Sequence, residues 1–127
     1  MSVRFLKTAE LEAGLDEIRR SPSDGGVLQL IVRRPDVGER EVVEEGDLDV
    51  ALGLVGDSWS RRRSPNPDMQ LNIMNARVLA LVAQDKARWP LAGDQLILDM
   101  DLSERNLPPG TRLAIGSAVI EVTAKPH

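Results

Sequence analysis

The residues with the clearest chemical potential lie in a polar loop at positions 57–68. Three consecutive arginines, Arg61, Arg62 and Arg63, follow Asp57 in a stretch rich in turn-forming residues. Guanidinium groups bind phosphates and carboxylates through paired N–H donors, so such a loop could hold an anionic ligand. Three charges in a solvated loop can equally serve solubility alone. The sequence leaves both interpretations open.

A second polar position, Asn75, stands between an alternating apolar–polar run at 69–74 and an Ala/Leu-rich run at 76–84. An amide at a strand-to-helix junction could present donors to a ligand. More often an asparagine in this place caps the helix that follows. We expect Asn75 to cap the helix and keep it as a candidate ligand contact.

Other catalytic chemistry has little support in the sequence. The 127 residues contain no cysteine, which excludes a disulfide, a thiolate nucleophile or a cysteine-based metal site within them. His127 is the only histidine, and scattered carboxylates around one histidine give no metal-ligand spacing. No phosphate-cradling glycine loop or dinucleotide fingerprint occurs. The sequence therefore identifies no catalytic residue and leaves open whether the protein is an enzyme.

Composition limits the class of protein further. A chain of 127 residues suits one domain that buries about two-thirds of its unfolded surface. Aromatic residues make up only 2%, so the core must be aliphatic. The net charge of −4 argues against nucleic-acid binding, which needs a basic surface. Without a signal-like N-terminus or an apolar run of about 18 residues, we expect no membrane association and a cytoplasmic location.

The elements that must position these residues are mostly short strands. An amphipathic helix is predicted at 8–20, with Thr8 as its N-cap and Leu11, Leu15 and Ile18 on one face. Residues 47–55 are ambiguous between helix and strand. The remaining elements are a hairpin of 27–32 with 39–44, a strand at 69–74, a helix at 76–84, and strands at 95–100, 111–115 and 118–123, the last two joined by Gly116 and Ser117. Many short strands with two inserted helices predict an α+β fold, mainly β, arranged as a partly closed barrel.

The last third of the chain resembles a known family. The segments Leu91-Ala92-Gly93-Asp94 and Leu102-Ser103-Glu104-Arg105-Asn106-Leu107, followed by the turn and strands to residue 123, resemble the MOSC family. This domain is named after the C-terminal part of molybdenum cofactor sulfurases. The resemblance covers roughly residues 50–127, is strongest from Trp89 onward, and extends to Gly56-Asp57. Arg105 is an insertion relative to the commonest form of the motif.

The resemblance implies a MOSC-like partly closed β-barrel and a role in sulfur transfer, in molybdenum cofactor handling or in reduction of N-hydroxylated compounds. Relatives place a reactive cysteine in the loop after the last strand, a few residues beyond the position of His127. We therefore expect residues 1–127 to be a single MOSC-like domain that is incomplete at its C-terminus. In such a loop His127 would lie beside the cysteine and lower the pKa of its thiol.

The resemblance also nominates contacts for a ligand. In the family a Gly-Asp pair opens a strand, and a segment like 104–107 borders the cleft, although Gly93 and Asn106 equally suit turns. The predicted ligand-binding residues are Asp57, Arg61, Arg62, Arg63, Asn75, Gly93, Asp94, Glu104, Asn106 and His127. The implied ligand or partner is a molybdopterin-type molecule or a cysteine desulfurase of pyridoxal phosphate-linked sulfur transfer. Exposed strand edges would also favour a homodimer.

Two functional hypotheses follow. The first is a MOSC-domain protein related to sulfur carriers, with the reactive cysteine absent from these residues. The second is a cysteine-free module that binds an anionic small molecule or a protein partner without catalysis. A purely structural module is a third interpretation, and it predicts no cleft lined by Asp57, Arg61 or Asn106.

Overall fold

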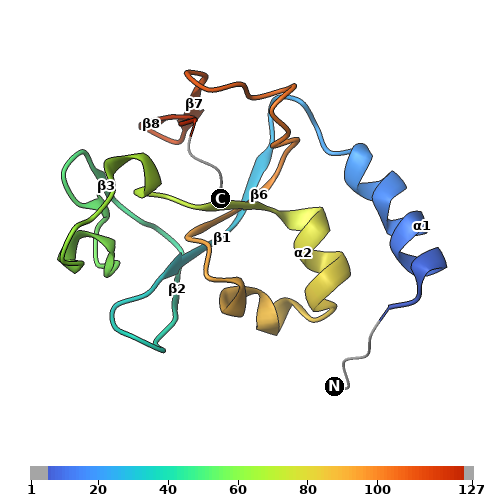
Figure 1. Cartoon of the computed structure of the whole chain (residues 1–127), viewed down its shortest axis with the longest axis horizontal. Helices are drawn as coiled ribbons and strands as arrows, with labels where there is room; N and C mark the ends of the chain where they lie inside the picture. Colours follow the sequence, from blue (N-terminus) through green and yellow to red (C-terminus); the bar gives the residue numbers. More distant parts are fainter. Residues whose placement is uncertain (1–5, 125–127) are drawn as a thin grey trace.

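The computed structural model describes residues 6–124. Within them the chain forms two α-helices, three 3-10 helices and eight short strands (Figure 1). In chain order these elements are α1 (Thr8–Arg19), β1 (Val27–Arg33), β2 (Glu41–Val43), β3 (Leu48–Asp49), β4 (Gly53–Leu54), η1 (Trp59–Arg61), η2 (Pro67–Met69), β5 (Ile73–Asn75), α2 (Ala76–Ala83), η3 (Lys86–Ala92), β6 (Leu96–Asp99), β7 (Arg112–Ile115) and β8 (Ala118–Glu121).

The strands are distributed over three sheets. The main sheet has the order β2-β1-β6-β5, in which β1 runs antiparallel to β2 and β6, and β5 runs parallel to β6. The pairs β3–β4 and β7–β8 form separate two-stranded sheets. Residues 6–124 therefore form an α+β fold, as predicted, and they contain no closed barrel.

The core is built around β6, the best-buried strand of the main sheet. Leu96, Ile97 and Leu98 are all buried, and their side chains alternate between the two faces. Ile97 packs with Trp89 and the helix α2 on one face. Leu96 and Leu98 pack on the opposite face, toward the two small sheets. Burial on both faces explains why this strand reads as a continuous apolar run.

Strand β1 carries an irregularity that sorts its side chains between the same two faces. The register with β6 shifts between Leu28 and Leu30. Side chains two positions apart on a strand normally lie on the same face of the sheet. Leu28 nevertheless contacts the cluster of Leu98, whereas Leu30 contacts the cluster of Ile97. The inserted residue of a bulge explains this change of side.

The helices cover one face of the main sheet in two layers (Figure 1). Helix α2 and η3 lie on the sheet, and α1 packs outside α2. Arg77 of α2 joins three elements, because its Nε donates to Asp99 Oδ1 at 2.8 Å and its Nη1 donates to the Glu17 carbonyl of α1 at 3.1 Å. No residue of α1 is buried, so this helix contributes little to the core.

Most predicted elements are confirmed, with changes at their ends. The hairpin of β1 with β2, the helix α2 and the hairpin of β7 with β8 all form. Helix α1 has its N-cap at Lys7 rather than at Thr8. The ambiguous stretch 47–55 forms the β3–β4 hairpin. The alternating run from Met69 becomes a strand only at Ile73, because Pro67 begins a 3-10 turn.

The loop at 57–68 is more ordered than its composition indicates. It contains η1 and the start of η2, and Trp59 is buried within it.

None of the helices in residues 6–124 combines the length and the apolar character needed to cross a bilayer.

Asn75 provides a test of how the fold joins α2 to the main sheet. Its side-chain oxygen accepts from the N–H groups of Arg77 and Val78, and its amide donates to the Met100 carbonyl at 2.8 Å. Loss of an N-cap costs about 1 kcal/mol, and an unpaired carbonyl costs about as much again. We expect Asn75→Ala to lower the free energy of unfolding by about 2 kcal/mol in urea denaturation. Asn66→Ala is the control.

Asn66 also caps a helix, but it is exposed and caps only the short η2 through the Asp68 N–H. Its loss should cost well under 1 kcal/mol. Equal effects of the two substitutions would contradict the junction role of Asn75.

Candidate functional site

A buried ion pair links the end of β1 to the loop after β4. Arg34 Nη2 lies 3.2 Å from Asp57 Oδ2, and the Arg34 backbone N–H donates to Asp57 Oδ1 at 2.8 Å. The Asp57 side chain is fully buried and that of Arg34 is 14% exposed. A buried charge is tolerated only when it is paired and hydrogen-bonded, and this carboxylate meets both conditions.

Further donors complete this arrangement. Gln95 Nε2 donates to Asp57 Oδ2 at 3.3 Å, and the Trp59 N–H donates to the same oxygen at 3.2 Å. Arg34 Nη1 donates to the Gly93 carbonyl at 3.0 Å. We call Arg34, Asp57 and Gln95 the buried polar network. It connects β1, the loop 57–68 and the start of β6.

The network sets the ionisation of Asp57. Burial raises the pKa of this carboxyl, but the hydrogen bonds and charge of Arg34, with the Trp59 N–H, lower it more. The net result is a pKa below the ordinary aspartate value. Asp57 is therefore a charged structural group whose oxygens are already occupied by donors, and it is poorly suited to proton transfer.

The predicted arginines lie beside this network but do not converge on a cavity. Arg61 donates to the backbone carbonyls of Pro35 and Asp57, the latter at 3.5 Å. Arg62 and Arg63 are exposed on the same loop. Gly93 adopts a left-handed conformation, with φ 84°, at the end of η3, and the adjacent Asp94 is buried.

The remaining predicted residues serve a second junction. Asn106 donates through its amide to the carbonyls of Ser23 and Asp101, at 2.9 and 2.8 Å. Asn75 binds the neighbouring Met100 carbonyl, so the two asparagines hold consecutive carbonyls after β6. Glu104 is exposed in the turn between Asp101 and Leu107. His127 lies outside the described residues.

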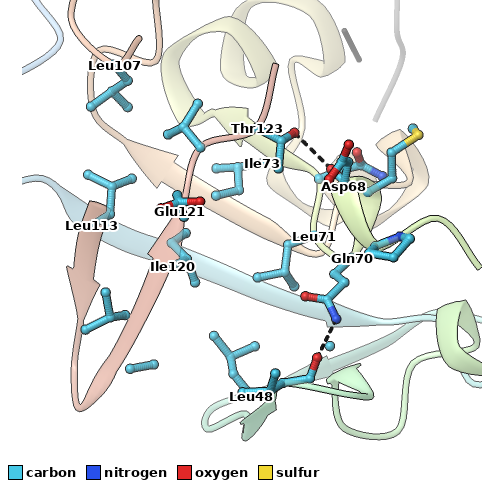
Figure 2. Close-up of a pocket in the computed structure, with 18 of the residues that line it drawn as sticks. Leu48, Asp68, Gln70, Leu71, Ile73, Leu107, Leu113, Ile120, Glu121 and Thr123 are labelled. Atoms are coloured by element: carbon cyan, nitrogen blue, oxygen red, sulfur yellow. Dashed lines mark hydrogen bonds between the residues drawn. The ribbon is translucent and has the colours of Figure 1, made fainter. Parts of the chain in front are cut away.

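A groove with a volume of about 680 Å³ lies elsewhere among the described residues (Figure 2). One wall comes from β8 and the residues just after it. The second wall comes from residues 67–73, and the β3–β4 hairpin borders one end. Leu71, Leu113 and Ile120 point into it (Figure 2). Of the ten predicted ligand residues, the nine that lie within residues 6–124 are absent from the lining of this groove.

The polar groups around the groove are engaged mainly within the fold. Gln70 Nε2 donates to the Val50 carbonyl at 2.7 Å, and Thr123 Oγ1 donates to the Asp68 carbonyl at 2.9 Å, where it ties β8 to η2 (Figure 2). Within residues 6–124 the charged lining residues are Asp49, Asp68 and Glu121, and Glu121 Oε1 lies 3.5 Å from Arg112 Nε. The described lining of the groove is therefore mainly apolar and carries three carboxylates.

Neither Arg34 nor Gln95 was predicted from the sequence, and the groove was not predicted either. The sequence does contain a signal for Arg34 and Gln95. Each lies next to one end of an apolar strand, where a polar side chain that becomes buried needs a hydrogen-bond partner. Metal binding has no support in residues 6–124, where no three His, Asp or Glu residues form a group that could hold an ion.

Comparisons with known proteins add no assignment. No protein-family model, no curated protein and no solved structure matches the chain.

The network predicts a specific effect of pH. Because the pKa of Asp57 is lowered on folding, its contribution to stability is complete above the unfolded pKa of about 4 and is lost as the pH falls through the folded value. We expect Asp57→Asn to lower the free energy of unfolding by about 3 kcal/mol at pH 7, because it leaves Arg34 buried without its counter-charge. Urea denaturation at several pH values measures this difference.

The difference between wild type and Asp57→Asn should shrink as the pH is lowered from 5 toward 2. Asp24→Asn is the matched control, since Asp24 is exposed and accepts from the adjacent Gly25 N–H. A constant gap across this range would mean that Asp57 is not the titrating group.

Proposed function

We propose that this chain is a MOSC-like domain that acts as a binding module, with the groove as its binding site. One observation carries the proposal. The segment whose sequence resembles the MOSC family, from Trp89 onward, contains β8 and Leu107, which line one wall of the groove. A cavity of about 680 Å³ lies in the range of about 300–1,000 Å³ typical of ligand pockets.

The partly closed barrel is part of this proposal. Leu113, Ile115 and Val122 from the β7–β8 region pack against Leu98 of the main sheet and against Leu107. The hairpin therefore lies over one face of the main sheet, as a barrel wall would. The groove occupies the opening between this wall and β5.

Binding is favoured over catalysis by the chemistry of the lining. Its interior is apolar, and Gln70 and Thr123 bind backbone carbonyls of the protein itself. Asp49 Oδ1 accepts from the N–H groups of Ala51 and Leu52. No pair of groups in this lining is arranged as nucleophile and base.

The resemblance suggests a molybdopterin-type ligand. The flat ring of a pterin suits apolar walls, and its phosphate would lie outside the groove, because the lining described within residues 6–124 supplies no cation. A sulfur atom carried as a persulfide would reside on a group other than these 127 residues, which contain no cysteine. In this role the module would hold the acceptor while a cysteine desulfurase donates sulfur.

A protein partner is the second candidate, and the charge of the groove favours it. Among residues 6–124 three carboxylates and no lysine or arginine line the groove, and one of them, Glu121, pairs with the neighbouring Arg112 at 3.5 Å. This arrangement suits a cationic, apolar segment better than an anionic small molecule. The arginine loop at 61–63 is then a solvated surface.

Calorimetry with a pterin monophosphate tests the first candidate. Ile120→Asp places a carboxylate in the groove wall and should weaken binding at least tenfold, about 1.4 kcal/mol. Val82→Asp is the control, because Val82 is 62% exposed on α2 and does not line the groove. Both variants should retain the wild-type circular dichroism spectrum.

The arginine loop is tested with the same ligand. We expect the double variant Arg62→Gln/Arg63→Gln to bind as tightly as wild type, within about twofold, because neither side chain lines the groove. A large loss in this variant would move the site to the loop. Absence of pterin binding by wild type would remove the molybdopterin candidate.

A further inference from the structure

The groove is bordered by the open edges of two strands. β5 is the last strand of the main sheet, and in residues 6–124 β8 has β7 as its single partner. Every residue of β8 lines the groove, whereas β7 contributes only Leu113 and the strands β1, β2 and β6 contribute none. The groove therefore follows strand edges instead of lying on the face of a sheet.

The direction of the backbone groups on β8 follows from its pairing with β7. The Val122 N–H donates to the Thr111 carbonyl, and the Val122 carbonyl accepts from Gly110, both at 2.8 Å. In an antiparallel pair, residues that bond to the partner alternate with residues whose groups point away from it. The N–H and C=O groups of Val119 and Glu121 consequently point away from β7, and both residues line the groove.

The same alternation applies to β5. The Asn72 carbonyl accepts from the N–H groups of Gln95 and Leu96, at 3.0 and 3.3 Å, so the backbone of Asn72 faces β6. The next residue, Ile73, then directs its backbone groups to the open edge. Ile73 also lines the groove. The outward backbone groups of β8 and of Ile73 thus border the same cavity.

The composition of the border indicates the occupant. Ile73, Leu71 and Ile120 offer apolar contacts to alternate side chains of an extended segment, and Asp49, Asp68 and Glu121 would attract basic residues beside them. A second copy of this chain is disfavoured, because a net charge of −4 on each copy opposes an acidic border.

We propose that the groove binds an extended, basic and apolar peptide segment of another protein as an added β-strand, paired with the outward groups of Val119 and Glu121. Main-chain hydrogen bonds provide affinity in this mode, and the apolar wall selects the side chains. The proposal rests on the groove being the binding site, and it specifies the protein partner of the second candidate function.

Fluorescence anisotropy with a labelled peptide of alternating valine and lysine provides the direct test. Val119→Pro removes an outward N–H at an edge position where proline is tolerated, and Val119→Ala keeps that N–H. We expect at least tenfold weaker binding for Val119→Pro and a change within threefold for Val119→Ala. Equal affinities of the two variants would overturn the added-strand mode.

Charge is tested with a second pair of variants. Glu121→Lys should weaken peptide binding several-fold and reduce its dependence on salt, whereas Glu45→Lys, which is exposed and outside the groove, should not. A peptide of alternating valine and glutamate should bind at least tenfold more weakly than the lysine peptide. Equal binding of the acidic peptide would overturn the assigned partner chemistry.

Hydrogen exchange separates this inference from the proposed function. Bound lysine peptide should slow exchange of the Val119 and Glu121 amides. Pterin that binds in an Ile120-dependent manner, together with no peptide binding, would overturn the added strand and leave the small-molecule proposal standing. If Ile120→Asp weakens the binding of neither the pterin nor the lysine peptide, the groove is not the binding site.

Discussion

The rest of the structure depends on the buried pairing of Arg34 with Asp57. This pair fixes the end of β1 to the loop that follows β4, and Arg34 also binds the Gly93 carbonyl before β6. Gln95 extends the connection, because its Oε1 accepts from the Asn72 N–H at 2.8 Å, directly before β5. One set of buried hydrogen bonds therefore holds the ends of three strands. It also positions the loop whose continuation forms a wall of the groove.

The molecule uses its most conspicuous polar residues for architecture. Asp57, Asn75 and Asn106 have the side chains that ligand sites often employ, yet each donates to or accepts from the protein itself. The physical reason is that a buried polar group without a partner is costly, so folding satisfies it from within. The groove differs, because it is bordered by backbone groups that no strand pairs with in residues 6–124. Its described lining is mainly apolar with three carboxylates, and its open hydrogen-bonding capacity is in the backbone of strand edges.

Those edges result from the way the small sheets are anchored. The β7–β8 hairpin is held by apolar packing against Leu107 and by the bond from Thr123 to the Asp68 carbonyl. The apolar packing comes from Leu113 and Ile115 of β7 and from Val122, and Thr123 lies beyond β8, so within residues 6–124 β8 has no strand beside it on the groove side. A pair of edges this close to an apolar surface is a favourable site for strand addition. Such an added strand would also extend the sheet toward the closure expected of a barrel.

The sequence alone determined the local elements. The period of apolar residues predicts α2 and the β1–β2 hairpin, Asn75 is recognisable as a cap, and Gly116 marks the β7–β8 turn, because these features depend on neighbours a few residues away. Only the tertiary structure decided that Arg34 meets Asp57, 23 residues later, and that Asn106 reaches Ser23 across 83 residues. The groove is likewise assembled from separate segments of the chain. Contacts of this separation arise from packing, which no local pattern encodes, and they engage the side chains of Asp57 and Asn106 within the fold.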